Sequence, residues 1–506
     1  MKKPIYFVTI LLLTSLLTSA QENPNVILIM ADDLGYGDLS CYGATKLHTP
    51  HLDQLAASGI RFNNGHSSSA TCTPSRYAMM TGVYPWRKNG TGILPGDAAL
   101  IVPTNRITLP KVFKNAGYST AVIGKWHLGL GTQTEKNWNG DIAPGPNETG
   151  FDYSFIFPAT ADRVPTVFVE NHRVVALDPN DPIQVSYQHK IGDEPTGAEQ
   201  PQLLKMQATP GHGHNQTIVN GIGRIGYMQG GKMARWTDEE MPLTFLEKSR
   251  GFIREHHNQP FFLLYTLTEP HVPRVPSTMF KGKSGLGYRG DAILQLDWTV
   301  GQILAELDKA GIRNNTLILF TSDNGPVLDD GYLDGAVSMR NGHEPGGPLR
   351  GGKYSAFEAG TRIPMIVSWP GRIRAGVSDA LVCQLDLLAS FSALLQVAIP
   401  TGEAGDSENQ LAAFLGTSPE GRKELVTQGG ALCLIQNNWK YISPNPGPAN
   451  TDPERTNIET GNAAQPQLYN LQNDIGEKQN VAAAHPQQWK QMAKKLEAIK
   501  NRNVSF

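Results

Sequence analysis

The stretch Asn25-Val26-Ile27-Leu28-Ile29-Met30-Ala31-Asp32-Asp33 decides the fold class. Residues 25–30 form a short, almost continuously apolar run, which is typical of a strand that is buried on both faces of a sheet. Two acidic residues follow this run directly. Four further runs of the same kind occur later in the chain, at Ser119–Ile123, Phe261–Leu267, Thr316–Thr321 and Met365–Trp369.

Segments with helical patterns separate these runs. Buried strands that alternate with helices predict a doubly wound α/β sheet, mixed but mostly parallel and flanked by helices. Ligands bind beyond the carboxyl ends of the strands in such sheets, so we expect the polar residues that follow the strands to converge. The predicted helices are Pro50–Ser58, Leu109–Ala116, Met241–His256 and Tyr288–Ala310.

The length of the chain and the changes in residue composition along it predict two structural units. A chain of 506 residues is too long for one ordinary core. Residues 141–238 are rich in Pro, Gly and polar residues, which indicates long loops with short strands over the sheet edge. We predict a large domain over residues 21–424 and a smaller α+β subdomain over residues 425–506. Its strands are expected within residues 425–434, 439–442 and 468–471, and its closing helix at residues 486–500.

The first 20 residues predict a secretory signal. Two lysines precede the apolar run Ile5–Leu17, and small residues lead up to Ala20. A membrane anchor needs about 20 apolar residues, and this run is shorter. We therefore expect export with cleavage after Ala20 and no stable membrane insertion. The mature protein would be periplasmic in a Gram-negative bacterium and secreted otherwise.

The composition narrows the range of partners. Hydrophobic residues make up 40% of the chain and charged residues 18%, as in soluble globular proteins. The formal net charge is -2 and no basic block is present, so no nucleic-acid partner is expected. Four cysteines are too few for a disulfide scaffold in a chain of this length. The sequence leaves open whether Cys383 pairs with Cys433.

Two acidic pairs predict a cation site. Asp32-Asp33 and Asp323-Asn324 each follow an expected strand and together offer three carboxylates and one amide oxygen. A helix cap explains one aspartate at such a position but rarely two. Oxygen ligands of this kind suit Ca²⁺ or Mg²⁺ and not Zn²⁺.

Cys72 lies in an unusual setting for a structural cysteine. Its segment, residues 68–82, reads Ser-Ser-Ala-Thr-Cys-Thr-Pro-Ser-Arg-Tyr-Ala-Met-Met-Thr-Gly and leads into a helix expected at residues 77–81. A thiolate nucleophile at a helix N-terminus is one interpretation. The acidic pairs argue against a thiol protease, which needs a metal-free site. This segment, together with Gly124-Lys-Trp-His-Leu-Gly129, Pro270-His-Val-Pro273 and Thr321-Ser-Asp-Asn-Gly325, resembles the formylglycine-dependent sulfatases.

The resemblance implies an alkaline-phosphatase-like fold and the hydrolysis of sulfate monoesters. It implies that Cys72 is oxidised to formylglycine by a formylglycine-generating or anaerobic sulfatase-maturating enzyme. It also implies that Asp32, Asp33, Asp323 and Asn324, together with residue 72, hold Ca²⁺, with Mg²⁺ as the less expected ion. In this family one hydroxyl of the hydrated aldehyde attacks sulfur, and the second hydroxyl later expels the sulfate.

Cationic and imidazole side chains receive roles from the same resemblance. Arg76 is assigned to the charge beside the metal, Lys125 to a sulfate oxygen and His127 to the base that deprotonates the nucleophile. His271 and Lys353 match positions that bind sulfate and protonate the leaving oxygen. The sequence leaves open which of these two residues is the acid.

The loop region, residues 141–238, indicates which class of substrate to expect. Its pattern is similar to that of bacterial sulfatases that cleave 6-O-sulfate from galactose or N-acetylgalactosamine in host or algal glycans. The segment Gly221-Ile-Gly-Arg-Ile-Gly226 matches a dinucleotide fingerprint, but it follows a polar stretch and no strand, so nucleotide binding is not expected. The candidate substrate contacts are Asp162, Arg163, His212 and His214.

Two alternative functions follow from the same residues. A phosphomonoester or phosphonate monoester hydrolase of the same fold would usually recruit extra His and Asp ligands for two Zn²⁺ ions. A glycan-binding protein without activity would carry an unconverted Cys72. A sulfated carbohydrate is the expected partner in the main interpretation.

Overall fold

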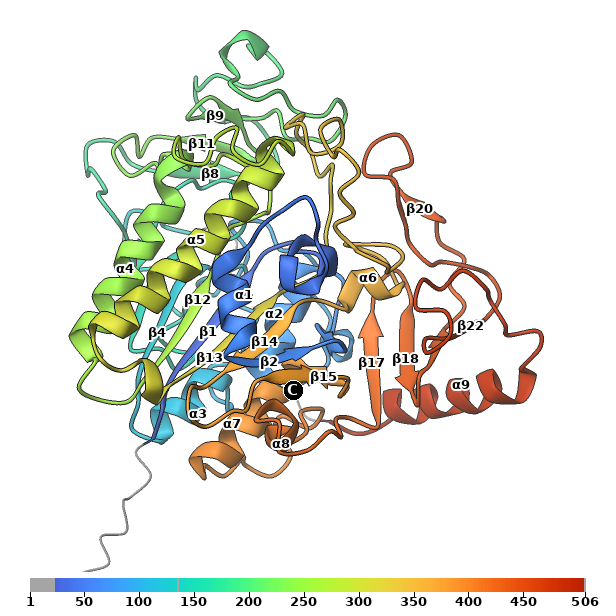
Figure 1. The fold of residues 1–506 in the computed structure, drawn as a ribbon. Coiled ribbons are helices and arrows are strands. Elements are labelled where there is room, and N and C mark those ends of the chain that lie inside the picture. Colours follow the sequence, from blue (N-terminus) through green and yellow to red (C-terminus); the bar gives the residue numbers. More distant parts are fainter. Residues whose placement is uncertain (1–22, 134–135, 505–506) are drawn as a thin grey trace, which may run out of the picture.

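The computed structural model describes residues 23–133 and 136–504 (Figure 1). The predicted signal segment, residues 1–20, lies outside the described residues. The centre of the molecule is a ten-stranded sheet with the strand order β15-β2-β14-β13-β1-β12-β4-β5-β6-β7. Its five middle strands, β13, β1, β12, β4 and β5, are parallel, whereas β14 and β6 run antiparallel to their inner neighbours. The predicted mixed, mostly parallel sheet is confirmed.

The five runs expected as strands are all strands of this sheet. They are β1 (Asn25–Ala31), β4 (Ser119–Lys125), β12 (Phe261–Thr266), β13 (Thr316–Ser322) and β14 (Met365–Ser368). The sequence did not single out the other five, which are β2 (Gly59–Phe62), β5 (Tyr153–Phe157), β6 (Val169–Glu170), β7 (Arg173–Val174) and β15 (Gly376–Ser378).

Alternate residues of β1 enter two separate cores, as expected for a strand covered on both faces. Val26 and Leu28 pack in the core that contains residues of α2 (Cys72–Thr81), α3 (Leu109–Asn115) and α7 (Leu387–Leu395). Ile27 and Ile29 pack in the core beneath the helices that lie in front of the sheet in Figure 1. These helices are α1 (Pro50–Ala57), α4 (Met241–His256) and α5 (Gly287–Lys309).

The C-terminal residues form a second sheet beside the first (Figure 1). Its antiparallel order is β17-β18-β19-β22, and α9 (Pro486–Lys500) packs against β18 and β19. The run 425–434, expected as strand, is divided by a turn, because β17 ends at Gln428 and β18 begins at Leu432. The domain boundary itself stays a prediction. The four strands are β17 (Glu424–Gln428), β18 (Leu432–Gln436), β19 (Trp439–Ile442) and β22 (Gln467–Asn470).

The loop region 141–238 contributes β5, β6 and β7 to the large sheet and also carries two small sheets of its own. These pair β8 (Gln184–Ser186) with β11 (Tyr227–Gln229), and β9 (Ile218–Val219) with β10 (Ile222–Gly223). Cys383 and Cys433 are both free thiols, so the pairing that the sequence left open is not formed. Within the described ranges, none of the helices has the length and apolar character that crossing a membrane requires.

Candidate active site

The two acidic pairs lie together because the strands before them are neighbours. β1 and β13 are parallel and are paired along their whole length, so both chains leave the sheet at the same place. The backbone N–H of Asp33 donates to Asp323 Oδ1 (3.3 Å), and Asn324 Nδ2 donates to Asp33 Oδ1 (2.7 Å). All of these side chains are buried, as is that of Asp32. The sheet register therefore builds an acidic site.

The donor atoms of this site fit a divalent cation. Asp32 Oδ1 and Asn324 Oδ1 are buried and have no hydrogen-bond partner. Burial and the charge of Asp323 raise the pKa of Asp32 well above its usual value, although Lys125 opposes this shift. A cation with oxygen ligands would occupy the unpaired oxygens and relieve the repulsion between the carboxylates.

Cys72 is the first residue of α2, so the helix expected at residues 77–81 begins five residues earlier. The reason is that Pro74 falls in the first turn, where a missing backbone N–H costs nothing. Cys72 is 1% exposed. Burial raises the pKa of its thiol, whereas the nearby cations Lys125 and Lys353 act to lower it.

Arg76 lies one turn after Cys72 and reaches the acidic site. Its Nε and Nη2 both donate to Asp323 Oδ2 (3.0 and 2.8 Å), and its Nη1 donates to the carbonyl oxygen of Lys125 (3.1 Å). The side chain is 2% exposed, which excludes the interpretation of a solvated arginine on a helix surface. Arg76 thus ties α2 to the ends of β13 and β4.

Lys125 and His127 follow β4 but do not share an extended segment. The alternation expected over Gly124–Gly129 is wrong beyond Lys125, because β4 ends there and His127 has a φ of 54°. Lys125 Nζ donates to Asp32 Oδ2 (2.5 Å). His127 Nε2 donates to the carbonyl oxygen of Leu94 (2.9 Å), which leaves its buried Nδ1 without a partner. Burial, with the charge of Lys125, lowers the pKa of His127 well below its usual value, so its imidazole is neutral.

His271 and Lys353 approach the same site from two other segments. Lys353 Nζ donates to Asp33 Oδ2 (2.9 Å) and to Asp330 Oδ2 (2.8 Å). Burial acts to lower the pKa of Lys353, but these two carboxylates raise it well above its usual value. His271 Nε2 lies 3.8 Å from Asp33 Oδ2, and its Nδ1 donates to the carbonyl oxygen of Val272 (2.6 Å). Burial and the charge of Lys353 lower the pKa of His271.

The residues described so far form one group, which we call the strand-end cluster. Most of them follow strands of the large sheet, and several of their charged groups lie near Cys72. The strand-end cluster consists of Asp32, Asp33, Cys72, Arg76, Lys125, His127, His271, Asp323, Asn324 and Lys353.

A second group of residues, which we call the substrate wall, comprises Asp162, Arg163 and His214. Arg163 Nη1 donates to both carboxylate oxygens of Asp162 (3.0 Å each), and His214 Nε2 lies 3.0 Å from Asp162 Oδ2. Burial acts to raise the pKa of Asp162, but Arg163 and His214 hold it well below its usual value. Cys72 also contributes to the raised pKa of Arg163, after Asp162 and Tyr187, so the wall borders the strand-end cluster.

His212, the fourth candidate substrate contact, lies beside this group, with its ring centroid 5.4 Å from that of His214, but its side chain bonds another segment. Its Nε2 bonds Thr456 Oγ1 (3.1 Å) in the hairpin formed by β20 (Asn450–Thr451) and β21 (Ile458–Glu459). The backbone oxygen of His212 accepts a hydrogen bond from His214 Nδ1 (3.0 Å). The C-terminal hairpin is therefore linked to the wall through His212.

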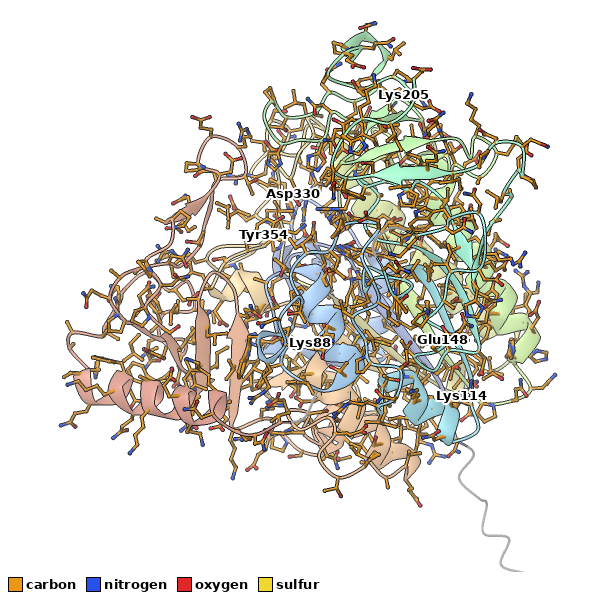
Figure 2. All side chains as sticks on the ribbon, turned by 180° about the vertical axis from the view of Figure 1, so that it is seen from behind. Lys88, Lys114, Glu148, Lys205, Asp330 and Tyr354 are labelled. Carbon is orange, nitrogen blue, oxygen red and sulfur yellow. The ribbon has the colours of Figure 1, made fainter. Side chains whose placement is uncertain are left out.

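Sequence reasoning missed Asp330 and Tyr354. Figure 2 labels the two residues close together, and Tyr354 Oη donates to Asp330 Oδ1 (3.1 Å). The pair Asp329-Asp330 before Gly331 was a usable signal, since it repeats the doublet of acids seen at Asp32-Asp33. It was missed because no expected strand precedes it.

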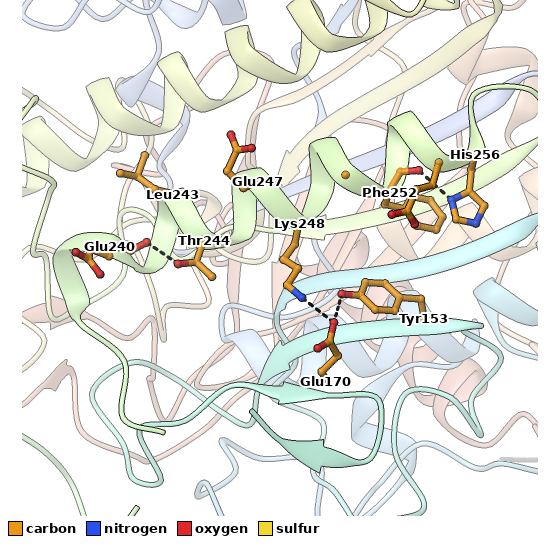
Figure 3. A pocket seen from close by; sticks show the side chains of 11 residues that line it. Tyr153, Glu170, Glu240, Leu243, Thr244, Glu247, Lys248, Phe252 and His256 are labelled. Atoms are coloured by element: carbon orange, nitrogen blue, oxygen red, sulfur yellow. Dashed lines mark hydrogen bonds and ion pairs between the residues drawn. The ribbon is translucent and has the colours of Figure 1, made fainter. Parts of the chain in front are cut away.

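A separate hollow of about 860 Å³ lies along α4 (Figure 3). Lys248 Nζ and Tyr153 Oη both donate to Glu170 Oε1 there (2.7 and 2.6 Å). None of the residues that line it belongs to the strand-end cluster or to the substrate wall. Among the described residues, the one group of at least three potential metal-ligating His, Cys, Asp or Glu side chains is Asp32, Asp33 and His271.

Comparisons with known proteins agree on one family. The profile of the sulfatase family matches residues 24–397. The chain is 52% identical to an N-acetylgalactosamine-6-O-sulfatase of Bacteroides thetaiotaomicron, over 95% of this chain and 94% of the relative. It is 30% identical to human arylsulfatase A, over 94% of this chain and 87% of the relative.

Solved structures extend the similarity to the fold. A B. thetaiotaomicron sulfatase from work on the metabolism of multiple glycosaminoglycans superposes with a TM-score of 0.93. It is 51% identical and covers 95% of this chain and 100% of its own. A protein crystallised with a neocarrahexaose has a TM-score of 0.68 at 27% identity, over 95% of this chain and 93% of its own.

Proposed function

The chain belongs to the sulfatase family, and we propose that it removes 6-O-sulfate groups from galactose or N-acetylgalactosamine residues of glycans. It is a sulfuric ester hydrolase by its family and by its 52% identity to a bacterial sulfatase. This identity extends over 95% of the chain and is the observation that carries the sugar specificity, since that relative is an N-acetylgalactosamine-6-O-sulfatase.

Four side chains hold a calcium ion in this proposal, namely those of Asp32, Asp33, Asp323 and Asn324, with residue 72 beside them. The bound ion would supply positive charge, and formylglycine at position 72 would supply the attacking oxygen. The unpaired Oδ1 atoms of Asp32 and Asn324 support the ion. Cys72 is 1% exposed, so a maturating enzyme would have to oxidise it before the chain folds. Export, as predicted from residues 1–20, is part of the proposal.

Fixed cations bind the sulfate group. Arg76, Lys125 and Lys353 come from different segments, and each is held by a carboxylate. Because these carboxylates orient the cations in advance, little reorganisation is needed when the ester binds. These side chains neutralise the equatorial sulfate oxygens.

Protons move through the imidazoles and Lys353. His127 Nδ1 has no partner while Nε2 carries the proton, so Nδ1 is the atom that takes a proton from the nucleophile at position 72. His271 and Lys353 both approach Asp33 Oδ2, and one of them protonates the leaving sugar oxygen. The substrate wall of Asp162, Arg163 and His214 binds sugar hydroxyls, because it offers charged donors and acceptors at the border of the cluster.

Sulfate release from defined sugars tests the proposal. The matured protein would be incubated with 6-sulfated N-acetylgalactosamine and galactose, with 4-sulfated N-acetylgalactosamine and 6-sulfated N-acetylglucosamine, and with 4-nitrophenyl sulfate and phosphate. We expect the two 6-sulfated galacto sugars to react fastest. Preference for another sulfated sugar would overturn the specificity, and faster turnover of the phosphate ester would favour the phosphomonoester hydrolase. An unconverted Cys72 in mass spectra of natively produced protein would favour the glycan-binding alternative.

A further inference from the structure

Lys353 forms a buried ion pair with Asp330, a residue to which the reaction as described gives no role. Asp330 is 8% exposed and Lys353 is 2% exposed. Lys353 Nζ lies 2.8 Å from Asp330 Oδ2 and 2.9 Å from Asp33 Oδ2, so the ammonium group is shared between two carboxylates. One of these carboxylates is a proposed calcium ligand and the other is not.

The chain around Lys353 is shaped to reach Asp330. Tyr354 has a φ of 73°, which is rare for a residue with a side chain. In this conformation the consecutive side chains of Lys353 and Tyr354 both reach the Asp330 carboxylate. Tyr354 Oη donates to Asp330 Oδ1 (3.1 Å), and Lys353 Nζ donates to Asp330 Oδ2. Backbone strain of this kind persists only where the surrounding contacts hold it.

The loop that carries Asp330 also contacts the substrate wall. A Cβ on Gly331 would lie 2.2 Å from the His214 ring, so this loop and the ring pack without space for a side chain. Thr209 Oγ1 donates to Asp329 Oδ1 (2.9 Å), which fixes the loop independently of Lys353. Asp330 therefore stands between a cation of the strand-end cluster and the residues proposed to bind the sugar.

We propose that Asp330 is a positioning residue that shares the Lys353 ammonium group with Asp33, and so keeps that group available to the ester instead of bound to Asp33 alone. Without Asp330, Asp33 would be the remaining carboxylate partner of Lys353. The ammonium group, which already lies 2.9 Å from Asp33 Oδ2, would then be held by Asp33 alone and would compete more strongly with the calcium ion for the Asp33 oxygens. This inference rests on the proposed function for the role of Lys353, and it predicts two separate losses, in turnover and in calcium affinity.

A double-mutant cycle with Asp330→Asn and Lys353→Met tests the proposal. Turnover of 4-nitrophenyl sulfate is measured so that the result does not depend on the sugar specificity. We expect Asp330→Asn to lower kcat about 10-fold with KM nearly unchanged, and to add nothing in the Lys353→Met background. Full additivity of the two effects would overturn the proposal, because Asp330 would then act without Lys353.

Calcium affinity gives a readout that needs no activity. It is taken from the dependence of the melting temperature on added Ca²⁺ in the unmatured, intact chain. We expect Asp330→Asn to weaken the apparent affinity about 5-fold. Asp329→Asn keeps an acceptor oxygen for Thr209 and should leave both affinity and kcat unchanged. A lower melting temperature in Asp330→Asn with normal calcium affinity and normal kcat would show a merely structural role.

Two further variants cover a failure of Asp330→Asn to fold. Tyr354→Phe keeps both carboxylates and should lower kcat about 2- to 3-fold, since it removes one hydrogen bond to Asp330. Asp330→Glu restores the charge and should recover part of the lost turnover. If the chain hydrolysed no sulfate ester at all, the proposed function would fail while the calcium titration still decided the role of Asp330. Unchanged kcat in Tyr354→Phe together with no recovery of turnover in Asp330→Glu would count against the proposal.

Discussion

The strand-end cluster and the substrate wall are neighbours that are built in different ways. The cluster gathers around the carboxyl ends of parallel strands, where the pairing of β1 with β13 sets the positions of its two acidic pairs. The wall consists of loop residues held by side-chain contacts, such as those of His214 with Asp162 and with the backbone of His212. The comparison predicts that the chemistry depends on the sheet, whereas the choice of sugar depends on loops.

Loss of the nucleophile is expected to have the largest effect. Cys72→Ala should lower the hydrolysis of every sulfate ester, sugar or aryl, by at least about 10⁴-fold, because no attacking oxygen can form at position 72. Cys41→Ala, outside the cluster, is the matched control and should retain activity. If the Cys72→Ala variant kept its activity on sugar sulfates, the nucleophile would not be residue 72. The reaction would then not take place at the strand-end cluster.

Removal of calcium comes next. A chelator should lower turnover about 100-fold for sugar and aryl sulfates alike, and added Ca²⁺ should restore it. Because the proposed ion would bind the folded chain and not the unfolded one, saturating calcium at 100 times its Kd should also add about 2.7 kcal/mol of stability. Thermal melting with and without Ca²⁺ measures this gain. Asp32→Asn should abolish most of it, and a full calcium response in that variant would move the ion to another site.

The sequence predicted the strand-end cluster well because a strand and the residues after it form one continuous pattern. The run 25–30 gave the position of Asp32 and Asp33, and the run 316–321 gave that of Asp323 and Asn324. The same reasoning failed for His127, since the backbone turns at that residue, and for the start of α2, where the polar segment before Tyr77 hid the first turn.

The substrate wall shows what sequence patterns cannot supply. Asp162 and His214 were candidates, but their contact joins segments 52 positions apart in the chain with no regular element that pairs them. Asp330 and the hairpin at Thr456 lie still further away along the chain. Side-chain contacts between loops leave no periodic signal, so only the structure brings these residues together.

A change in the wall should separate sugar from aryl substrates. His214→Ala removes a bond to the buried Asp162 carboxylate, and hydrogen bonds to charged groups contribute about 1.5–3 kcal/mol. We therefore expect kcat/KM for 6-sulfated N-acetylgalactosamine to fall about 10- to 100-fold, with 4-nitrophenyl sulfate nearly unaffected. His212→Ala is the matched control, with a much smaller loss. Equal losses on both substrates would place His214 in the chemistry.

The C-terminal hairpin should have a weaker influence on the same substrates. Thr456→Val keeps the size of the side chain and removes the hydroxyl that bonds His212 Nε2. We expect KM for the sugar sulfate to rise about 2- to 5-fold with kcat unchanged, in line with the loss of one ordinary hydrogen bond. Thr451→Val serves as control, since that hydroxyl bonds within the hairpin to the Ile458 carbonyl oxygen. If KM stayed constant, the hairpin would not support the wall.

The smallest effect concerns a buried group of three charged residues, Lys440, Glu358 and Glu477, which joins strand β19 of the C-terminal sheet to two other segments of the chain. Lys440 Nζ lies 2.9 Å from Glu358 Oε1 and 3.1 Å from Glu477 Oε1, and all three side chains are fully buried. Burial raises the pKa of Glu477 to about 7 from an ordinary value of 4.5. A raised carboxyl pKa stabilises the folded state fully below pH 4.5, and this stability is lost as the pH rises through about 7.

Glu477→Gln should remove this pH dependence, because the amide cannot ionise. Between pH 5 and pH 8 the melting temperature of the unchanged protein should fall by about 1–3 °C more than that of the variant. Glu497→Gln, an exposed position on α9, should follow the unchanged protein. Parallel melting curves for all three proteins would mean that Glu477 keeps its charge in the folded state, with Lys440 compensating both carboxylates. The contacts of Lys440 with Glu358 and Glu477 would then be equally strong at either pH. In that case protonation of Glu477 would have no influence on the C-terminal hairpin or on the substrate wall.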